Sequence, residues 1–93
     1  MFVEEFFDLG HIVATPGALE ALNSSDQNPA VFVKRHASGD WGEIDQEDRE
    51  SNEQALMHGE RLLSAYATSR GQRLWVITEA DRSGTCILLP EEY

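Results

Sequence analysis

The last third of the chain constrains the fold most, because its apolar residues follow the two-residue period of β-strands. Three runs rich in β-branched and apolar residues occupy 62–68, 73–78 and 85–89. Two polar clusters of turn-forming residues, 69–72 and 81–84, separate these runs. Connections this short join neighbouring antiparallel strands as hairpins. The spacing therefore predicts a three-stranded antiparallel meander in the C-terminal third.

Two short helices are expected upstream, because two capping residues are each followed by proline. Thr15-Pro16 and Asn28-Pro29 combine a side-chain acceptor for free N–H groups with a residue that lacks the N–H. Polar or glycine-containing segments at 23–26 and 38–39 end these helices. The run His11–Ala14 precedes them and is typical of a strand or a buried extended segment.

A third, longer helix is expected to begin at Asp45. Asp48 then falls at the third helical position, as in a capping box, and acidic residues in the first turns match the helix dipole. Gly59 suits a left-handed C-terminal cap.

Together these elements predict an α+β fold, in which the three-stranded antiparallel meander packs against two to three short helices. The 93 residues are enough for one domain, 1–93, and leave no room for a second core. The first ten residues fit either a short helix or an edge strand. The positions of the meander expected to be buried include Leu63, Ala65, Val76 and Ile87.

The charge balance excludes several classes of protein. Seven basic and 17 acidic residues give a net charge of −10, the opposite of the basic stripe that a direct nucleic-acid binder carries. No apolar run approaches the roughly 20 residues that span a bilayer, and the N-terminus lacks the pattern of a secretory signal. The single Cys86 excludes an intramolecular disulfide and fits a reducing, cytoplasmic setting as a buried, inert thiol.

The acidic residues concentrate in one stretch, where residues 40–60 hold eight carboxylates. One interpretation is an ordinary solvated helix face. The other is a surface that imitates the charge spacing of nucleic acid and occupies a basic groove on a protein that handles DNA or RNA. The carboxylates assigned to partner binding are Glu43, Asp45, Glu47, Asp48, Glu50 and Glu53.

Residues 36–42 form an unusual loop, in which two glycines flank Asp40-Trp41. The Trp41 ring could plug the gap between helices and sheet while a neighbouring polar residue caps the next segment. Alternatively, Trp41 is an exposed aromatic anchor for a partner. The sequence leaves both interpretations open.

An enzymatic alternative uses His36 as general base, Glu79 as general acid and Arg82 to stabilise phosphoryl charge, as in a small nuclease-like or toxin-like enzyme. A net charge of −10 repels an RNA substrate, so no residue is assigned a catalytic role. The three histidines are too widely spaced for a zinc site, and residues 45–48 lack the central glycine and terminal glutamate of an EF-hand. We therefore expect neither a metal nor a cofactor.

Four segments together resemble a family of small uncharacterised acidic proteins of bacterial plasmids, phages and other mobile elements. They are Ile12–Leu19, His36–Gly42, Trp75–Ser83 and Ile87–Tyr93, and the resemblance runs from about residue 9 to the C-terminus. It implies no established activity, cofactor or catalytic residue. It does imply a setting in which inhibitors of host restriction or CRISPR enzymes are useful.

The leading hypothesis is thus a small, non-enzymatic acidic binding protein of a mobile element. Its expected partner is a protein with a basic surface, such as a host defence enzyme or another nucleic-acid enzyme. We expect no direct nucleic-acid binding and no membrane association, and homo-oligomerisation is left open. A plain scaffold domain is the remaining alternative.

Overall fold

The computed structural model describes residues 5–93, so residues 1–4 of the ambiguous N-terminal segment lie outside the described residues. Residues 5–10 are neither helix nor strand. The elements that follow are β1 (His11–Ala14), α1 (Pro16–Ser24), α2 (Pro29–Ala37), α3 (Gln46–His58), β2 (Leu62–Ala67), β3 (Arg73–Thr78), β4 (Gly84–Leu88) and the short 3-10 helix η1 (Pro90–Glu92).

The three predicted helix starts are confirmed at the level of individual hydrogen bonds. Thr15 Oγ1 accepts from the backbone N–H of Ala18 at 3.2 Å, and Asn28 Oδ1 accepts from that of Ala30 at 2.9 Å. The side chain of Asp45 caps α3 in the same way. These helices begin where local chemistry places them, because each cap satisfies an otherwise unpaired donor.

The sheet corrects the predicted architecture. Strands β2, β3 and β4 form the expected antiparallel meander, but β1 adds a fourth strand that pairs parallel to β4, so the order is β1-β4-β3-β2 and the sheet is mixed. The run His11–Ala14 is therefore a strand, although His11, Ile12 and Val13 are exposed rather than buried. The meander could be predicted from local turns, whereas the parallel pair joins segments about seventy residues apart.

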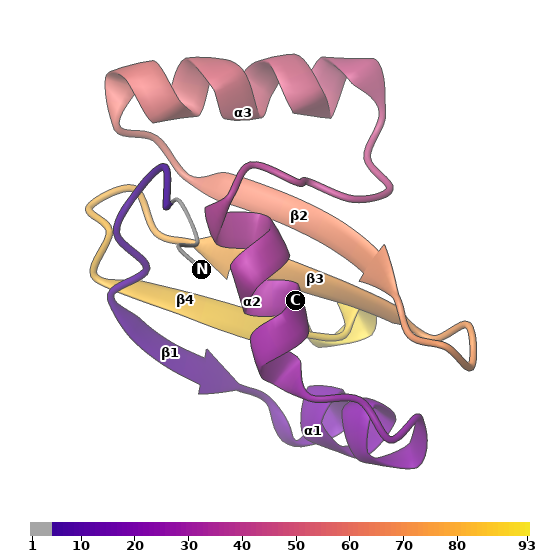
Figure 1. Cartoon of the computed structure of the whole chain (residues 1–93). Coiled ribbons are helices and arrows are strands. Elements are labelled where there is room, and N and C mark those ends of the chain that lie inside the picture. Colours follow the sequence, from indigo (N-terminus) through magenta and orange to yellow (C-terminus); the bar gives the residue numbers. More distant parts are fainter. Residues whose placement is uncertain (1–4) are drawn as a thin grey trace.

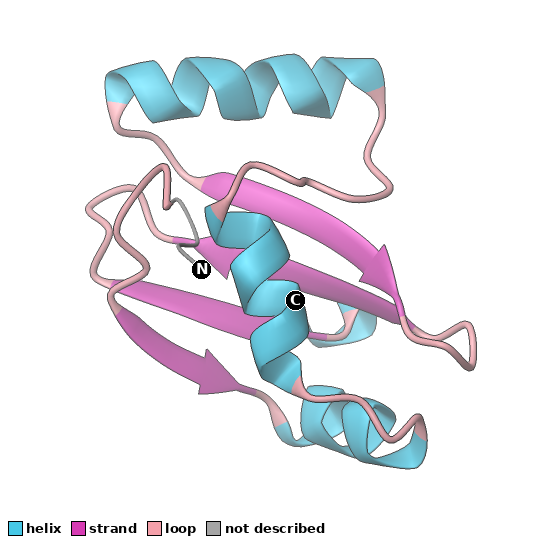
Figure 2. Cartoon of the chain, in the orientation of Figure 1, coloured by secondary structure: helices cyan, strands magenta, loops and turns pink. Residues whose placement is uncertain are grey.

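The helices are distributed unevenly around this sheet. Figures 1 and 2 show α2 crossing one face, α3 running alongside β2 and α1 following the end of β1. Leu74, Val76 and Ile87 point to the helix-covered face and join the main core with Leu22 and Phe32. No helix among residues 5–93 is long and apolar enough to cross a membrane.

The predicted burial in the meander is largely correct. Val76, Ile87 and Ala65 are buried, while Leu63 is only half-buried. Leu63 and Ala65 lie on the face opposite Val76, because each is paired in register with a β3 residue of that other face. On this second face the Trp75 ring meets the Tyr93 ring edge-on, with the ring centroids 5.7 Å apart.

Candidate functional site

Helix α3 carries three predicted partner-binding residues on the side turned away from the sheet. Glu47, Glu50 and Glu53 are exposed, whereas Asn52 and Ala55 are buried on the opposite side. Residues three apart turn by about 60° around a helix, so the three glutamates span about 120° of its circumference. They therefore share one outward surface.

The other predicted carboxylates lie at the start of this helix. Asp45 Oδ1 accepts from the backbone N–H of Asp48 at 2.8 Å, and both residues are exposed. Glu43, in the preceding loop, pairs with Arg73 at 2.6 Å in an exposed ion pair of the kind worth about 0–1 kcal/mol. We call Asp45, Glu47, Asp48, Glu50 and Glu53 the acidic surface.

The carboxylates of the acidic surface form no salt bridge with the described residues, although Arg49 is exposed on the same helix between Asp48 and Glu50. Within residues 5–93 the ion pairs are Arg35–Asp40 and Arg73–Glu43, and neither includes a member of that surface. Most of the seven basic side chains are engaged elsewhere in the chain. The engaged ones are Arg35 with Asp40, Arg61 with the Tyr93 hydroxyl, Arg70 with the Ser24 carbonyl, Arg73 with Glu43, and Arg82 with four backbone carbonyls.

Asn52 attaches the acidic helix to the sheet, and sequence reasoning missed this role. Its side-chain amide donates to the Leu63 carbonyl at 2.7 Å and its carbonyl accepts from the Leu63 N–H at 3.1 Å. Asn52 thus pairs with the outer edge of β2 as a neighbouring strand would. A polar residue in the middle of the apolar side of a predicted helix was the available signal.

Replacing Asn52 with alanine should destabilise the protein by about 1–3 kcal/mol, because the Leu63 backbone groups lose both partners. Chemical unfolding measures this loss, and the Leu63 amide should exchange faster with solvent. The exposed Gln54→Ala change on the same helix is the control and should leave both nearly unaltered. Unchanged Leu63 exchange in Asn52→Ala would contradict this role.

Trp41 lies inside the molecule and not on the acidic surface. Its side chain is 1% exposed and packs with Ala55 and Leu62. The ring stacks on the Phe7 ring, with centroids 6.2 Å apart, and meets the His36 ring edge-on, with centroids 5.7 Å apart. The assignment of Trp41 as an exposed partner-binding anchor is therefore corrected: the ring fills the space between α3 and the sheet, where apolar burial is most favourable.

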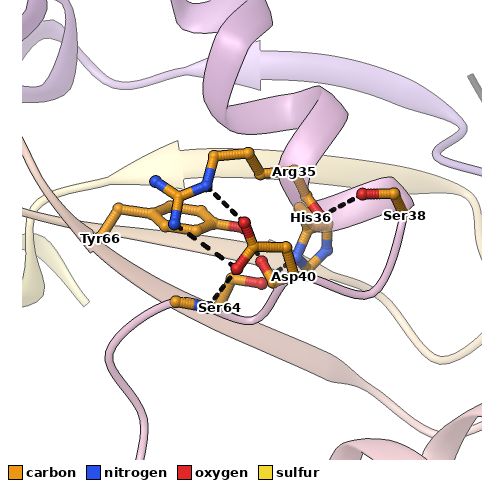
Figure 3. Close-up of polar contacts among 7 residues, drawn as sticks. Arg35, His36, Ser38, Asp40, Ser64 and Tyr66 are labelled. Atoms are coloured by element: carbon orange, nitrogen blue, oxygen red, sulfur yellow. Dashed lines mark hydrogen bonds and ion pairs between the residues drawn. The ribbon is translucent and has the colours of Figure 1, made fainter.

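The loop before Trp41 is held by a compact polar cluster, drawn in Figure 3. The Arg35 guanidinium donates to the Asp40 carboxylate at 2.7 Å and lies over the Tyr66 ring, 4.5 Å from its centroid. The Tyr66 hydroxyl donates to the Asp40 carbonyl at 2.6 Å, and burial raises the pKa of Tyr66 to about 12. Hydrogen bonding to Arg35 lowers the pKa of the Asp40 carboxyl. The cluster fixes the loop that carries Trp41.

The backbone at position 42, one of the two glycine positions in this loop, requires glycine. Its φ is 75°, and a Cβ there would lie 2.1 Å from the Ala65 carbonyl oxygen. Only glycine allows residues 41–43 to run this close to β2, where the Ala65 N–H donates to the Trp41 carbonyl at 3.0 Å.

His36 is fully buried and occupied by hydrogen bonds. One ring nitrogen, Nδ1, lies 2.5 Å from Ser64 Oγ, and Nε2 lies 2.9 Å from Thr78 Oγ1. Burial, with a smaller contribution from Arg82, lowers the pKa of His36 to about 4. A ring this enclosed stays neutral and ties α2 to the sheet.

The residues of the enzymatic alternative do not form a common cleft. Arg82 donates to backbone carbonyls at the end of α3 and in the turn after β3, including Ala55 at 3.1 Å and Glu60 at 2.6 Å. Glu79 is exposed in that same turn. The Phe7 ring contacts His36 edge-on at 5.2 Å and also lies under the Arg82 guanidinium. Arg82 thus acts as a helix-terminal cap, which complements the helix dipole.

The described residues contain no group of three or more side chains arranged to hold a metal ion. Cys86 is a free cysteine of intermediate exposure, and burial raises the pKa of its thiol. A raised pKa disfavours the reactive thiolate form.

Comparison of the chain with family models, with curated proteins and with solved structures finds no match.

Proposed function

We propose that this protein is a small, non-enzymatic binding protein whose acidic surface occupies a basic surface on a protein partner. The observation that carries the proposal is the unpaired charge of α3. Asp45, Glu47, Asp48, Glu50 and Glu53 have no ion-pair partner within residues 5–93, while most of the cationic side chains are used to hold the fold.

The geometry of the helix supports a partner that normally binds nucleic acid. Glu47, Glu50 and Glu53 follow one another at a rise of about 4.5 Å along the helix axis. One strand of DNA presents a charge about every 3.4 Å along its axis, which is the same order of spacing. A groove lined with Arg and Lys would attract both arrays.

The position of α3 also favours access by a large partner. The helix lies beside the outermost strand, β2, and its outward side faces away from the rest of the molecule (Figure 1). Its 13 residues extend about 20 Å, enough to follow a groove across several phosphate sites.

The resemblance to mobile-element proteins narrows the partner to enzymes that act on nucleic acid, with host restriction or CRISPR enzymes as the first candidates. In this proposal the protein inhibits by occupying the groove. The enzymatic alternative has less support, because its His36 ring is fully buried.

The test replaces Glu47, Glu50 and Glu53 together with glutamine. Glutamine keeps helix propensity, so the stability should change little, whereas association with the partner should slow because the steering charge is removed. The full chain is coupled to a resin, incubated with lysate of a bacterial host, and the retained proteins are quantified by mass spectrometry at increasing salt. Retention should fall steeply as the Debye length shrinks from about 10 Å at 0.1 M to about 3 Å at 1 M.

A matched control is the triple change of Glu20, Glu79 and Glu91 to glutamine, which alters the net charge equally at exposed positions outside α3. It should retain the same proteins as the unmodified chain. Duplex DNA or RNA added to the lysate should compete for them. Retention that is insensitive to salt and to the α3 substitutions would overturn the proposal, as would nuclease activity of the purified chain that His36→Ala abolishes.

A further inference from the structure

One edge of the sheet is open. The N–H of His11 donates to the Ser83 carbonyl, and the N–H of Thr15, just after β1, donates to the Ile87 carbonyl of β4. By alternation, the N–H and C=O groups of Ile12 and Ala14 point outward. No hydrogen bond from residues 5–93 reaches these four groups. Figure 1 likewise shows β1 as an outermost strand.

The opposite edge of the sheet is closed. The outward groups of β2 bond to the side chain of Asn52 at Leu63, and to the backbone of Trp41 and Glu43 at Ala65. Among the described residues, β1 is therefore the edge at which another strand can be added.

β1 presents an exposed apolar side chain on each face of this open edge, with the exposed His11 beside Val13 on one of them. Ile12 and Val13 are each 49% exposed. Ile12 borders a shallow apolar groove of about 370 Å³ that reaches Pro29 and Val33 of α2. On the other face, Val13 continues a cross-strand row through Cys86, Ile77 and Leu63. An edge strand with exposed apolar side chains and no charge is a template for pairing.

We propose that the occupant of this edge is a second copy of the same chain, paired antiparallel through β1 about a two-fold axis. The axis passes at Val13, so that Val13 faces its counterpart and Ile12 faces Ala14 of the other copy. This register uses all four outward backbone groups of each copy. If the axis passed at Ile12 instead, Ala14 would pair with Gly10 of the other copy. Gly10 would then need an extended backbone, but its φ is 65°.

The distribution of charge favours this occupant. The acidic helix α3 lies beside β2, at the far side of the sheet from β1. In the paired arrangement the two copies of β2 are the outer strands of an eight-stranded sheet, about 34 Å apart at the usual strand spacing. That separation exceeds the Debye length of about 8 Å at physiological salt, so the two acidic surfaces repel each other little and both stay accessible.

A second copy also adds more contact than a short foreign peptide would. The open edge is four residues long and offers few hydrogen bonds, but each copy brings its own exposed Ile12 and Val13. Two-fold pairing buries Ile12 and Val13 of both copies. It also places the cross-strand row that contains Val13 next to the same row of the other copy.

Sedimentation equilibrium of the full chain tests the assembly. We expect twice the 10.4 kDa chain mass, with association that strengthens as salt screens the net charge of −10. Ile12→Lys should give a monomer, because it places a charge at the junction. Met57→Lys, an equal charge change at an exposed position of α3, should remain dimeric. A monomeric unmodified chain, or a dimer that persists in Ile12→Lys, would overturn the proposal.

Disulfide trapping tests the register in a Cys86→Ser background. Val13→Cys should cross-link on oxidation, because directly opposed residues of this kind have Cα atoms about 4.5 Å apart. Ile12→Cys should not, because diagonal neighbours lie about 7–8 Å apart. Preferential cross-linking of Ile12→Cys would overturn the register. Slow amide exchange of Ile12 and Ala14 in a monomer would show that another segment of the same chain is hydrogen-bonded to this edge, and would overturn the proposal.

Discussion

Replacing Trp41 with alanine should cost about 3–5 kcal/mol of stability, enough to unfold much of the population of a domain this small. The side chain is 1% exposed and joins α3, β2 and the loop after α2 in one cluster with Ala55 and Leu62. Its removal leaves a cavity that flanking backbone can fill only in part. Chemical unfolding followed by circular dichroism measures the loss.

Two further variants separate packing from other effects of this change. Trp41→Phe keeps an aromatic ring and removes the indole N–H, which has no hydrogen-bond partner among residues 5–93, so it should cost less than alanine. Trp75→Ala removes a ring that is only half-buried and should also cost less. A Trp41→Ala protein with unaltered stability would contradict the core assignment and restore the role of Trp41 as a partner anchor.

Acidification should destabilise the folded protein between pH 6.5 and 4 through His36. Burial lowers the folded-state pKa of His36 to about 4 from its ordinary value of 6.5, so the unfolded chain binds the proton more tightly. The stability of the neutral, buried ring is fully present above pH 6.5 and is lost as the pH falls toward 4. The total is about 3 kcal/mol, at 1.36 kcal/mol per pKa unit.

The measurement is the free energy of unfolding by urea at several pH values across this window. His36→Asn should flatten the dependence, because asparagine does not titrate, even if the variant is less stable throughout. His58→Asn, at an exposed position, should keep the full slope. The carboxyl of Asp40, whose pKa Arg35 lowers, contributes stability that is lost only at more acidic pH, as the pH falls below its ordinary value of 3.8. Equal slopes in the unmodified and His36→Asn proteins would contradict the assignment.

Some residues of the candidate site could be assigned from the sequence, and others could not. The exposed carboxylates of α3 could be assigned from the sequence, because charge density and helix caps are local properties. Trp41 could not, because its sequence neighbours fit a presented ring and a buried one equally well. Its burial depends on Phe7 and Ala55, which lie far from it along the chain and next to it in space. The structural roles of Asn52 and Arg82 were missed for the same reason, since both bond to backbone that tertiary folding brings near.

The sequence by itself determined where the helices begin and which strands form hairpins. Thr15, Asn28 and Asp45 act on N–H groups within three residues, and the turns at 69–72 and 81–84 join strands that are already neighbours. Only the tertiary structure decided that His11–Ala14 pairs parallel to β4 and that His36 is enclosed between α2 and the sheet. Both depend on contacts between residues tens of positions apart, and such contacts leave no local pattern because their partners are selected by the packing of the whole domain.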